Sequence, residues 1–290
     1  MADVLQRSAG LSVTALEAIA DLERRVLAVD GGRLKLEWNH LRARAGDQVS
    51  DMLWWDGDRL LGFGGIYVFG GAAPEIAGMV DPAARRRGIG GALLDAAVET
   101  CRERGLGKRL LLVPHASVGG RALALSRGGR LDHSEHALLL AGDPTDGPDD
   151  PRLTLRPARV DDAEAVGAIL GASFDWTPED LPSLLARNSE QERTLVVEED
   201  GRPVGTVRIT HSRTAGTDTG GIYGFAVHPA DQGRGIGRDV LRRCCRLLRE
   251  EGASRVGLEV AVENEHALGL YTDTGFVPVT TEDYYALPMP

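Results

Sequence analysis

Residues 227–241 read VHPADQGRGIGRDVL, and residues 80–94 read VDPAARRRGIGGALL. The two stretches start 147 residues apart, and this spacing aligns the glycines of one with the glycines of the other. The spacing continues without a gap as far as Gly128 and Gly275. A shared spacing over so many residues indicates duplication of a structural unit rather than chance similarity. We therefore expect two copies of one unit in the chain.

A segment rich in turn-forming residues separates the two copies. Residues 142–151 read GDPTDGPDDP. Proline and glycine interrupt helices and strands, and aspartate does not form a packed core, so we interpret this segment as a linker. The predicted domains are therefore residues 1–141 and 152–290, joined by the linker 142–151.

Each copy shows the pattern of a mixed sheet flanked by helices. Asp56-Gly57 and Asp200-Gly201 each lie between apolar runs, which predicts two hairpins with type I′ turns. In the second copy residues 222–227 form an apolar run that ends at Pro229, as a strand would. The order of elements, with hairpins beside strand–turn–helix units, predicts an α/β fold with a mixed sheet (α+β) rather than a doubly wound parallel sheet.

The composition is ordinary for a globular protein, and its charge is acidic. The chain has 33 Lys and Arg against 43 Asp and Glu, which gives a net charge of −10 and argues against a protein that coats nucleic acid. Residues 1–10 lack the apolar core of a signal peptide, and no apolar run is long enough to span a membrane. We therefore expect a cytoplasmic protein with neither nucleic-acid nor membrane partners, either a monomer or a homodimer.

Cysteine and lysine are both scarce in the chain. The chain has three cysteines, Cys101, Cys244 and Cys245. Their number is odd and their spacing is typical of neither disulfides nor zinc ligands, so we expect free thiols and no metal. Lys35 and Lys108 are the only lysines among the 33 basic residues, a bias that we attribute to a GC-rich genome.

The glycine turn after the strand at 222–227 is suited to binding a pyrophosphate. Glycines allow successive backbone N–H groups to converge, and the following helix adds its unpaired N–H groups and positive dipole end. The turn is not a P-loop, because no Lys-Ser/Thr pair follows, and its glycine spacing is not that of a dinucleotide site. Taken alone, it fits a simple tight turn equally well.

The residues of this turn resemble motif A of the GCN5-related N-acetyltransferases (GNAT), Gln/Arg-x-x-Gly-x-Gly/Ala. Gln232, Gly235 and Gly237 match in the second copy, and Arg85, Gly88 and Gly90 match in the first. The resemblance implies two tandem GNAT acyl-CoA N-acyltransferase domains, with acetyl-CoA as acyl donor. It assigns cofactor contacts to Phe225, Ala226, Val227, Gln232, Gly233, Arg234, Gly235, Ile236, Gly237, Arg238, Asn264 and Tyr271, and in the first copy to Val80, Arg85, Arg86, Arg87, Gly88, Ile89 and Gly90.

The later stretch LEVAVENEHALGLYTDTGF, residues 258–276, is similar to motif B, especially in the ribosomal-protein alanine N-acetyltransferase group. In that group the Glu acts as general base and the Tyr as general acid, which implies these roles for Glu259 and Tyr271. The chemistry needs such groups, because an α-amine with a pKa near 8 or a lysine amine near 10.4 must lose a proton before attacking a thioester. Backbone N–H groups near 225–227 would polarise the thioester carbonyl. Without the resemblance, Glu259 is better explained as a solvated strand residue and Tyr271 as part of the core.

The first copy lacks the catalytic residues. Leu112, Ser117 and Ala124 lie at the positions of Glu259, Asn264 and Tyr271. We therefore predict a catalytically degenerate N-terminal domain and one active site in the C-terminal domain. Glu75, before the first glycine turn, is a reserve candidate for a base, although a charged strand end is the simpler interpretation.

The predicted function is transfer of an acetyl group from acetyl-CoA to a primary amine of a small molecule or peptide within a ternary complex. The tandem layout also resembles mycothiol synthase, but Gly220-Gly221 replace the Glu expected there, so this acceptor is kept as an alternative. An alternative of another class is a non-catalytic acyl-CoA-binding sensor or scaffold. For the acceptor pocket we consider Phe174, Asp175, Trp176, Tyr284 and Tyr285, for which ordinary packing explains the aromatic residues equally well.

Overall fold

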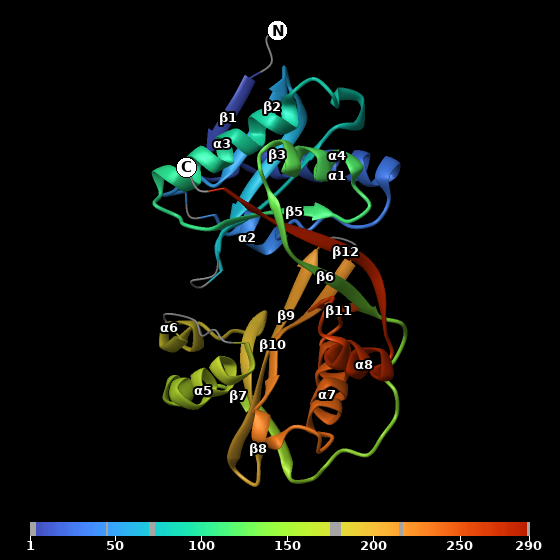
Figure 1. Cartoon of the computed structure of the whole chain (residues 1–290). Coiled ribbons are helices and arrows are strands. Elements are labelled where there is room, and N and C mark those ends of the chain that lie inside the picture. Colours follow the sequence, from blue (N-terminus) through green and yellow to red (C-terminus); the bar gives the residue numbers. More distant parts are fainter. Residues whose placement is uncertain (1–3, 45, 70–72, 175–180, 215–216, 289–290) are drawn as a thin grey trace. The chain divides into compact units, whose positions relative to one another are not determined.

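The structure is a computed structural model that describes residues 4–44, 46–69, 73–174, 181–214 and 217–288 (Figure 1). Its contacts divide the chain into two compact units. The N-terminal unit comprises residues 1–134 and 280–290, and the C-terminal unit comprises residues 135–279. Among the described residues, no helix is both long and apolar enough to cross a membrane.

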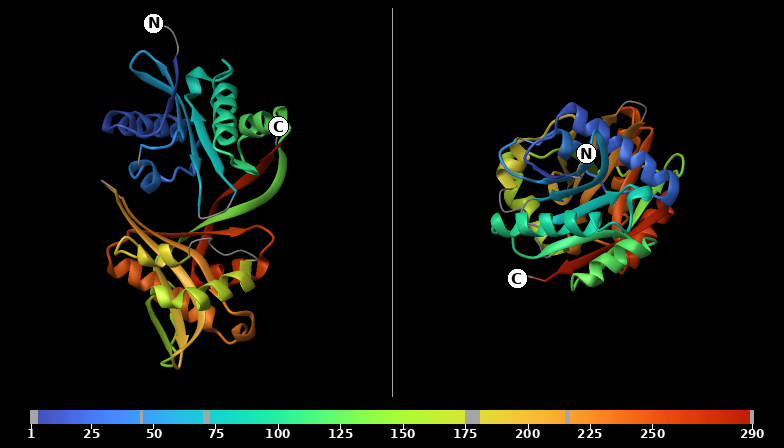
Figure 2. Two further views of the ribbon diagram at one scale, coloured as in Figure 1. Left: turned by 90° about the vertical axis from the view of Figure 1, so that its left-hand side faces the viewer. Right: turned by 90° about the horizontal axis from the view of Figure 1, so that it is seen from above.

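The N-terminal unit is a mixed sheet with helices on both faces, as the views of Figure 2 show. Its strands lie in the order β1-β2-β3-β4-β5-β12, and β4 and β5 are the parallel pair. Helix α1 packs on one face through Ile19, Leu22 and Val26, and α3 packs on the other through Leu93 and Leu94. Its elements are β1 (Val4–Ser8), α1 (Val13–Asp30), α2 (Trp38–Arg42), β2 (Asp51–Asp56), β3 (Arg59–Tyr67), β4 (Glu75–Val80), the 3-10 turn η1 (Pro82–Ala84), α3 (Ile89–Glu103), β5 (Arg109–Pro114), α4 (Val118–Ser126) and the start of β6 (Arg130–Leu140).

The C-terminal unit repeats this plan. Its strands lie in the order β6-β11-β10-β9-β8-β7, with β10 and β11 parallel. Helices α7 and α8 cover one face, and α5 and α6 cover the other. Its elements are β7 (Leu153–Pro157), the 3-10 turn η2 (Val160–Asp162), α5 (Ala163–Phe174), α6 (Leu181–Ala186), β8 (Glu192–Glu199), β9 (Arg202–Thr214), β10 (Thr217–Val227), the 3-10 turn η3 (Pro229–Asp231), α7 (Ile236–Glu250), β11 (Arg255–Ala261), α8 (Glu265–Thr274) and the start of β12 (Phe276–Leu287). The predicted mixed α/β sheet is thus confirmed in both units.

Two strands contribute residues to both units. Residues 282–287 of β12 pair antiparallel with β5 and therefore belong to the N-terminal unit. Residues 135–139 of β6 pair antiparallel with β11 in the C-terminal unit. The sequence predicted a division at 142–151 because a repeat search follows the order of residues along the chain. Strand pairing, which assigns 280–290 to the first unit, is not visible in that order.

The two predicted hairpins form, with different turns. In the second, Asp200 (φ 50°) and Gly201 (φ 81°) are both in the left-handed region, which is the predicted type I′ pattern. In the first, Asp56 pairs with Arg59, so the turn residues are Gly57 and Asp58 rather than Asp56 and Gly57. Only Gly57 has a positive φ (59°) there, which is the pattern of a type II′ turn, so the type I′ prediction was wrong at this position.

The segment 142–151 is bound to helix α7 by a row of arginines. Arg243 donates to the carbonyl oxygens of Asp150 (2.7 Å) and Leu153 (2.9 Å), and Arg242 donates to those of Asp146 (3.3 Å) and Pro148 (3.1 Å). The predicted linker residues thus pack within the C-terminal unit, because the segment's unpaired carbonyl groups find charged donors on the helix.

Candidate active site

Strand β10 carries a β-bulge beside its parallel neighbour. The register of β10 against β9 shifts between Tyr223 and Ala226, and Gly224 within the shift has a φ of 50°. The pairing of β10 with β11 ends at Ile222 opposite Leu258. Beyond that pair β10 no longer pairs with β11, although Ala226 and Val227 still pair with β9, so N–H groups on the β11 side of the strand can serve a ligand.

The bulge is a single inserted residue that distinguishes the two copies. In the N-terminal unit the parallel pairing ends at Ile76 opposite Leu111, and β4 pairs with β3 without a shift. Leu111 and Leu258 are 147 residues apart, whereas Ile76 and Ile222 are 146 apart. Before the bulge, therefore, Glu75 corresponds to Gly221. The sequence comparison missed this because the spacing was measured only downstream of the insertion.

The glycine turn of the C-terminal unit leaves its backbone open. Gly233 (φ 75°) and Gly235 (φ 83°) are left-handed, and a Cβ atom added at either would meet nothing within 4 Å. The first hydrogen bond of helix α7 joins Asp239 N to Gly235 O (3.1 Å), so the N–H groups of residues 236–238 precede the helical ladder. Gln232 Nε2 donates to Val227 O (2.9 Å), which ties the turn to the end of β10.

Gly237 sits where α7 approaches its neighbours. A Cβ atom there would lie 3.3 Å from Leu270 Cδ2 of α8 and 3.8 Å from Phe225 Cζ. Ile236 is buried in the core. The two residues therefore set the position of the helix start relative to β10 and α8.

Ion pairs fix the base of the turn. Arg234 contacts Glu199 (2.5 Å) and Asp231 (3.0 Å), and Arg202 also contacts Asp231 (2.7 Å). The hydrogen bond from Arg202 holds the pKa of Asp231 below its usual value. Arg238 pairs with Asp273 on α8 (2.7 Å). The side chains of Arg234 and Arg238, both predicted to contact cofactor, thus already have acidic partners, whereas the backbone of the turn remains available.

The glycine turn of the N-terminal unit has the same backbone course. Gly88 (φ 85°) corresponds to Gly235, and Arg86 (φ 65°) adopts the left-handed conformation of Gly233. Arg85 Nε donates to Val80 O (3.2 Å) as Gln232 does to Val227 O, and Arg85 also pairs with Asp30 (2.5 Å). A non-glycine residue in this conformation costs about 1 kcal/mol. Arg87 is exposed, and Ile89 and Gly90 begin α3.

Glu259 and Tyr271 come from opposite sides of strand β11. Leu258 and Val260 point into the core cluster that contains Tyr271 of α8. Successive side chains alternate between the faces of a strand, so the half-buried Glu259 points to the opposite face, which α5 covers. Tyr271 is 8% exposed, and burial raises its pKa to about 12. Its ring meets Phe276 edge-on, with 6.3 Å between ring centroids.

Asn264 and its counterpart Ser117 both cap helices. Asn264 Oδ1 accepts a hydrogen bond from Ala267 N (3.0 Å), and Ser117 Oγ accepts one from Gly120 N (3.2 Å). Leu112 and Ala124 correspond to Glu259 and Tyr271 by the spacing of 147 residues. Both are buried in apolar clusters of the N-terminal unit. Of the residues that the sequence predicted for an acceptor pocket, Phe174 is 48% exposed, and Asp175 and Trp176 lie outside the described residues.

Tyr284 and Tyr285 pack inside the N-terminal unit, opposite Leu112 and Leu111 of β5. The sequence placed them with the second copy because the pairing of β12 with β5 cannot be seen in the linear order. Ordinary packing, the alternative weighed for these aromatic residues, accounts for their burial. Among the described residues, no group of three or more His, Cys, Asp or Glu side chains is placed to hold a metal ion.

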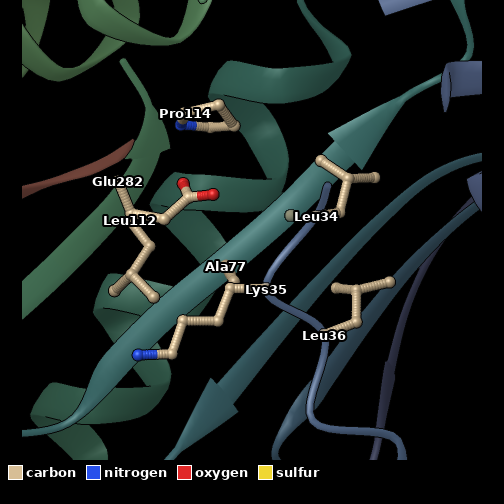
Figure 3. A pocket seen from close by; sticks show the side chains of 8 residues that line it. Leu34, Lys35, Leu36, Ala77, Leu112, Pro114 and Glu282 are labelled. Carbon is tan, nitrogen blue, oxygen red and sulfur yellow. The ribbon is translucent and has the colours of Figure 1, made fainter. Parts of the chain in front are cut away.

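A polar cluster lies in the N-terminal unit where β4 and β5 separate. The Lys35 amine is 3.7 Å from Glu75 Oε2 and 2.5 Å from the Tyr284 hydroxyl. Figure 3 shows the small cavity beside it, lined by Leu34, Lys35, Leu36, Ala77, Gly78, Leu112, Pro114 and Glu282. The sequence analysis named Glu75 but missed Lys35, although the scarcity of lysine in this chain was a signal that could have singled it out.

The chain is similar to known acetyltransferases along most of its length. The profile of the acetyltransferase (GNAT) family matches residues 16–126 and 160–276. A mycothiol acetyltransferase of Rhodococcus jostii is 30% identical over 293 residues, which cover 94% of each chain. One of Thermobispora bispora is 30% identical over 291 residues, covering 93% of this chain and 95% of its own.

Solved structures share the fold. A GCN5-related N-acetyltransferase from Sphaerobacter thermophilus matches with a TM-score of 0.78 at 19% identity and covers 99% of this chain and 97% of its own. A tandem GNAT protein from the clavulanic acid biosynthesis pathway matches with a TM-score of 0.72 at 17% identity, over the full length of both chains. The tandem arrangement found by the repeat search is thus an arrangement that solved structures also contain.

Proposed function

Because the chain belongs to the acetyltransferase (GNAT) family, we propose that its C-terminal unit transfers an acetyl group from acetyl-CoA to a primary amine. The observation that carries this assignment is the open glycine turn at 232–238 directly after the bulged strand β10. An exposed set of backbone N–H groups at a helix start suits the pyrophosphate of the donor. The neighbouring bulge offers N–H groups for the thioester carbonyl.

The donor contacts would be made mainly by backbone. The N–H groups of Gly235 to Arg238 would bind the pyrophosphate, with Gln232 holding the turn against Val227. The pantetheine arm would then run between β10 and β11, past Asn264 at the start of α8. The backbone of Phe225 and Ala226, in and just after the bulge, would polarise the thioester oxygen.

The proposed chemistry uses the two faces of β11. Glu259 accepts a proton from the acceptor ammonium, directly or through water, on the face covered by α5. The free amine attacks the thioester carbon, an amide C–N bond forms and the C–S bond breaks, and the second proton of the amine nitrogen passes through solvent to the CoA thiolate. Tyr271, on the other face, donates its hydroxyl hydrogen bond to the departing thiolate. A phenol with a pKa of about 12 remains protonated at neutral pH, so this donor is always available.

The catalytic carboxylate is tested by Glu259→Gln, which keeps the shape of the side chain and removes the base. We expect kcat for amine-dependent release of CoA to fall by about 10²-fold or more. Glu263→Gln, at an exposed carboxylate near the end of the same strand, is the matched control and is expected to retain activity. Equal activity of the two variants would remove Glu259 from the mechanism.

Donor binding is tested at Gly235, where a side chain meets open space but the backbone is left-handed. Asp and Asn both tolerate this conformation and differ by one charge. Gly235→Asp places a negative charge at the proposed pyrophosphate site, so its KM for acetyl-CoA is expected to rise well above that of Gly235→Asn. Equal KM values would place the donor elsewhere.

The acceptor most directly suggested by the relatives is the free-amine form of mycothiol, because two mycothiol acetyltransferases match this chain almost end to end. Gly220 and Gly221 oppose Val256 and Gly257 in the sheet, and a Cβ at Gly221 would lie 2.5 Å from the Tyr223 ring. Neither position carries a carboxylate, and Glu259 is the base that we propose instead. Comparing kcat/KM for this amine with a panel of primary amines tests the acceptor, and no preference over simple amines would reject it.

The proposal includes a cytoplasmic location, where acetyl-CoA is available. The three cysteines are free and buried, and burial raises the pKa of Cys245 to about 12. Such thiols suit a reducing compartment.

A further inference from the structure

The Lys35 amine lies where an acceptor amine would be needed in the N-terminal unit. By the spacing of 147 residues, Gly78 corresponds to Phe225 and Val80 to Val227. The proposed thioester position beside 225–227 therefore has a counterpart beside 78–80. Gly78 is exposed and lines the same cavity as Lys35, at the point where β4 has left its parallel pairing with β5.

Several contacts fix the Lys35 side chain at this place. It is 9% exposed, and its amine lies 5.1 Å from the centre of the Tyr284 ring and 2.5 Å from the hydroxyl of the same residue. His133 stacks on the Tyr284 ring with 4.2 Å between centroids. Tyr284 itself is 1% exposed and paired in the sheet. The amine is therefore held by a rigid support rather than by a mobile surface chain.

The cavity beside Lys35 is small and is lined by the Lys35 side chain itself. Its free volume is about 10 Å³, enough for a single water molecule. A free amine at this place would compete with the Lys35 side chain, which already lines the cavity. The amine presented to the β4–β5 opening is thus that of the chain.

We infer that Lys35 is an acyl acceptor, modified by acyl-CoA bound at the N-terminal glycine turn; this rests on the proposed use of acyl-CoA by the chain. The Glu75 carboxylate, 3.7 Å from the amine, takes one proton from the ammonium. The neutral amine attacks the thioester carbon, the C–N bond forms and the C–S bond breaks. The thiolate leaves with one proton as CoA, and the second proton passes to solvent. The product is N-acyl-Lys35, so the unit reacts once instead of turning over.

The chain supplies its own control in Lys108. This lysine is the only other one in the sequence, its side chain is 53% exposed, and it pairs with Asp132 on the surface (2.5 Å). Unassisted acylation favours the more accessible amine. Selective acylation of the buried Lys35 would therefore depend on the groups around its amine, Glu75 and Tyr284.

The test is incubation of the full-length protein with isotopically labelled acetyl-CoA, followed by intact mass and peptide mapping. We expect one label at Lys35 and much less at Lys108. Glu75→Gln is expected to slow Lys35 labelling at least about tenfold without changing that of Lys108. Label confined to Lys108, or no label at Lys35 while the protein acetylates added amines, would overturn the inference.

A charge introduced at each glycine turn separates the two proposals. Gly88, like Gly235, is left-handed with open space around its Cβ position. Gly88→Asp should suppress Lys35 labelling relative to Gly88→Asn, whereas Gly235→Asp should suppress transfer to added amines relative to Gly235→Asn. Loss of both products from Gly235→Asp alone would mean that Lys35 receives its acyl group from the C-terminal turn, and would overturn the N-terminal donor site. If the wild-type protein labels Lys35 but does not transfer acetyl groups to added amines, only the proposed function would be contradicted.

Discussion

At the scale of single residues, the environment of Tyr271 decides how it can act. Burial raises its pKa to about 12, well above that of a thiol. Such a phenol donates a hydrogen bond to a thiolate more readily than it gives up its proton. Catalysis would then depend on the position of the hydroxyl and not on its titration.

We predict that kcat shows no decline from Tyr271 ionisation up to about pH 10, because its pKa of about 12 keeps the phenol protonated. Tyr271→Phe keeps the ring that packs on Phe276 and should lower kcat about 10²-fold with little change in thermal stability. Steady-state pH profiles of both proteins provide the measurement. An alkaline limb near pH 10 that vanishes in the Phe variant would contradict this account.

Asp51 gives the N-terminal unit a distinct pH dependence. It is fully buried beside Arg44 (3.1 Å), and burial raises its pKa from 3.8 to about 6. Between pH 3.8 and pH 6 the Asp51 carboxyl is ionised in the unfolded chain but still protonated in the native protein. Rising pH therefore favours the unfolded state. The stability that this carboxyl contributes is complete below about pH 4 and is lost as pH rises through 6.

For Asp51→Asn, we predict that the unfolding free energy relative to the wild type increases by about 3 kcal/mol between pH 3 and pH 7, which is the shift of about two pKa units converted at 1.36 kcal/mol each. Denaturant unfolding at several pH values measures this difference. A relative stability that stays constant or falls over this interval would show that Asp51 is ionised in the native protein well below pH 6.

At the scale of elements, the arginines of α7 hold the segment 142–151 against the helix. Arg243 is 20% exposed and makes charged hydrogen bonds to two carbonyl groups and an ion pair to Asp239 (2.5 Å). Arg246 is 36% exposed and pairs with Asp149 (2.6 Å). The first side chain satisfies buried backbone groups, and the second makes a surface ion pair.

We predict that Arg243→Ala destabilises the C-terminal unit by about 1–3 kcal/mol, because it leaves carbonyl groups without donors. Arg246→Ala, three residues further along the same helix, should cost about 0–1 kcal/mol. Denaturant unfolding and hydrogen exchange of residues 142–153 measure both effects. Equal losses in the two variants would mean that the segment is held by its charges alone.

At the scale of the whole molecule, the last strand of the chain belongs to the sheet of the N-terminal unit. Residues 282–287 pair with β5, and Tyr284, Tyr285 and Leu287 are buried in the core of the N-terminal unit. The last residues of the chain therefore stabilise the N-terminal unit. Neither half of the linear sequence contains all the strands of its unit, because the N-terminal unit includes β12 and the C-terminal unit includes part of β6.

We predict that truncation after Val279 exposes the N-terminal unit while sparing most of the C-terminal one. Hydrogen exchange should accelerate in residues 109–114, which lose their partner strand, and much less in residues 255–258, which keep β10 as a neighbour. If protection were lost mainly in the C-terminal unit, the assignment of 280–290 to the N-terminal unit would be refuted.

The sequence alone determined the duplication, the mixed fold and the family, because these depend on local patterns. Glycines at the left-handed positions 88 and 235 and the apolar strands before them are recognisable wherever they occur. Glu259 and Tyr271 were named in the same way, and their roles remain predictions. The hairpin at Gly57 shows the limit, since the turn register depended on which residues pair across the strands.

Only the tertiary structure decided which residues meet across the chain. Lys35 lies in the connection between α1 and α2, Glu75 at the start of β4 and Tyr284 in β12, and no spacing in the sequence predicts that they meet. The inserted residue in β10 likewise became visible only through its pairing. Local patterns arise from forces between neighbours in the chain, whereas long-range pairing arises from packing and hydrogen bonding between segments whose separation in the sequence carries no information.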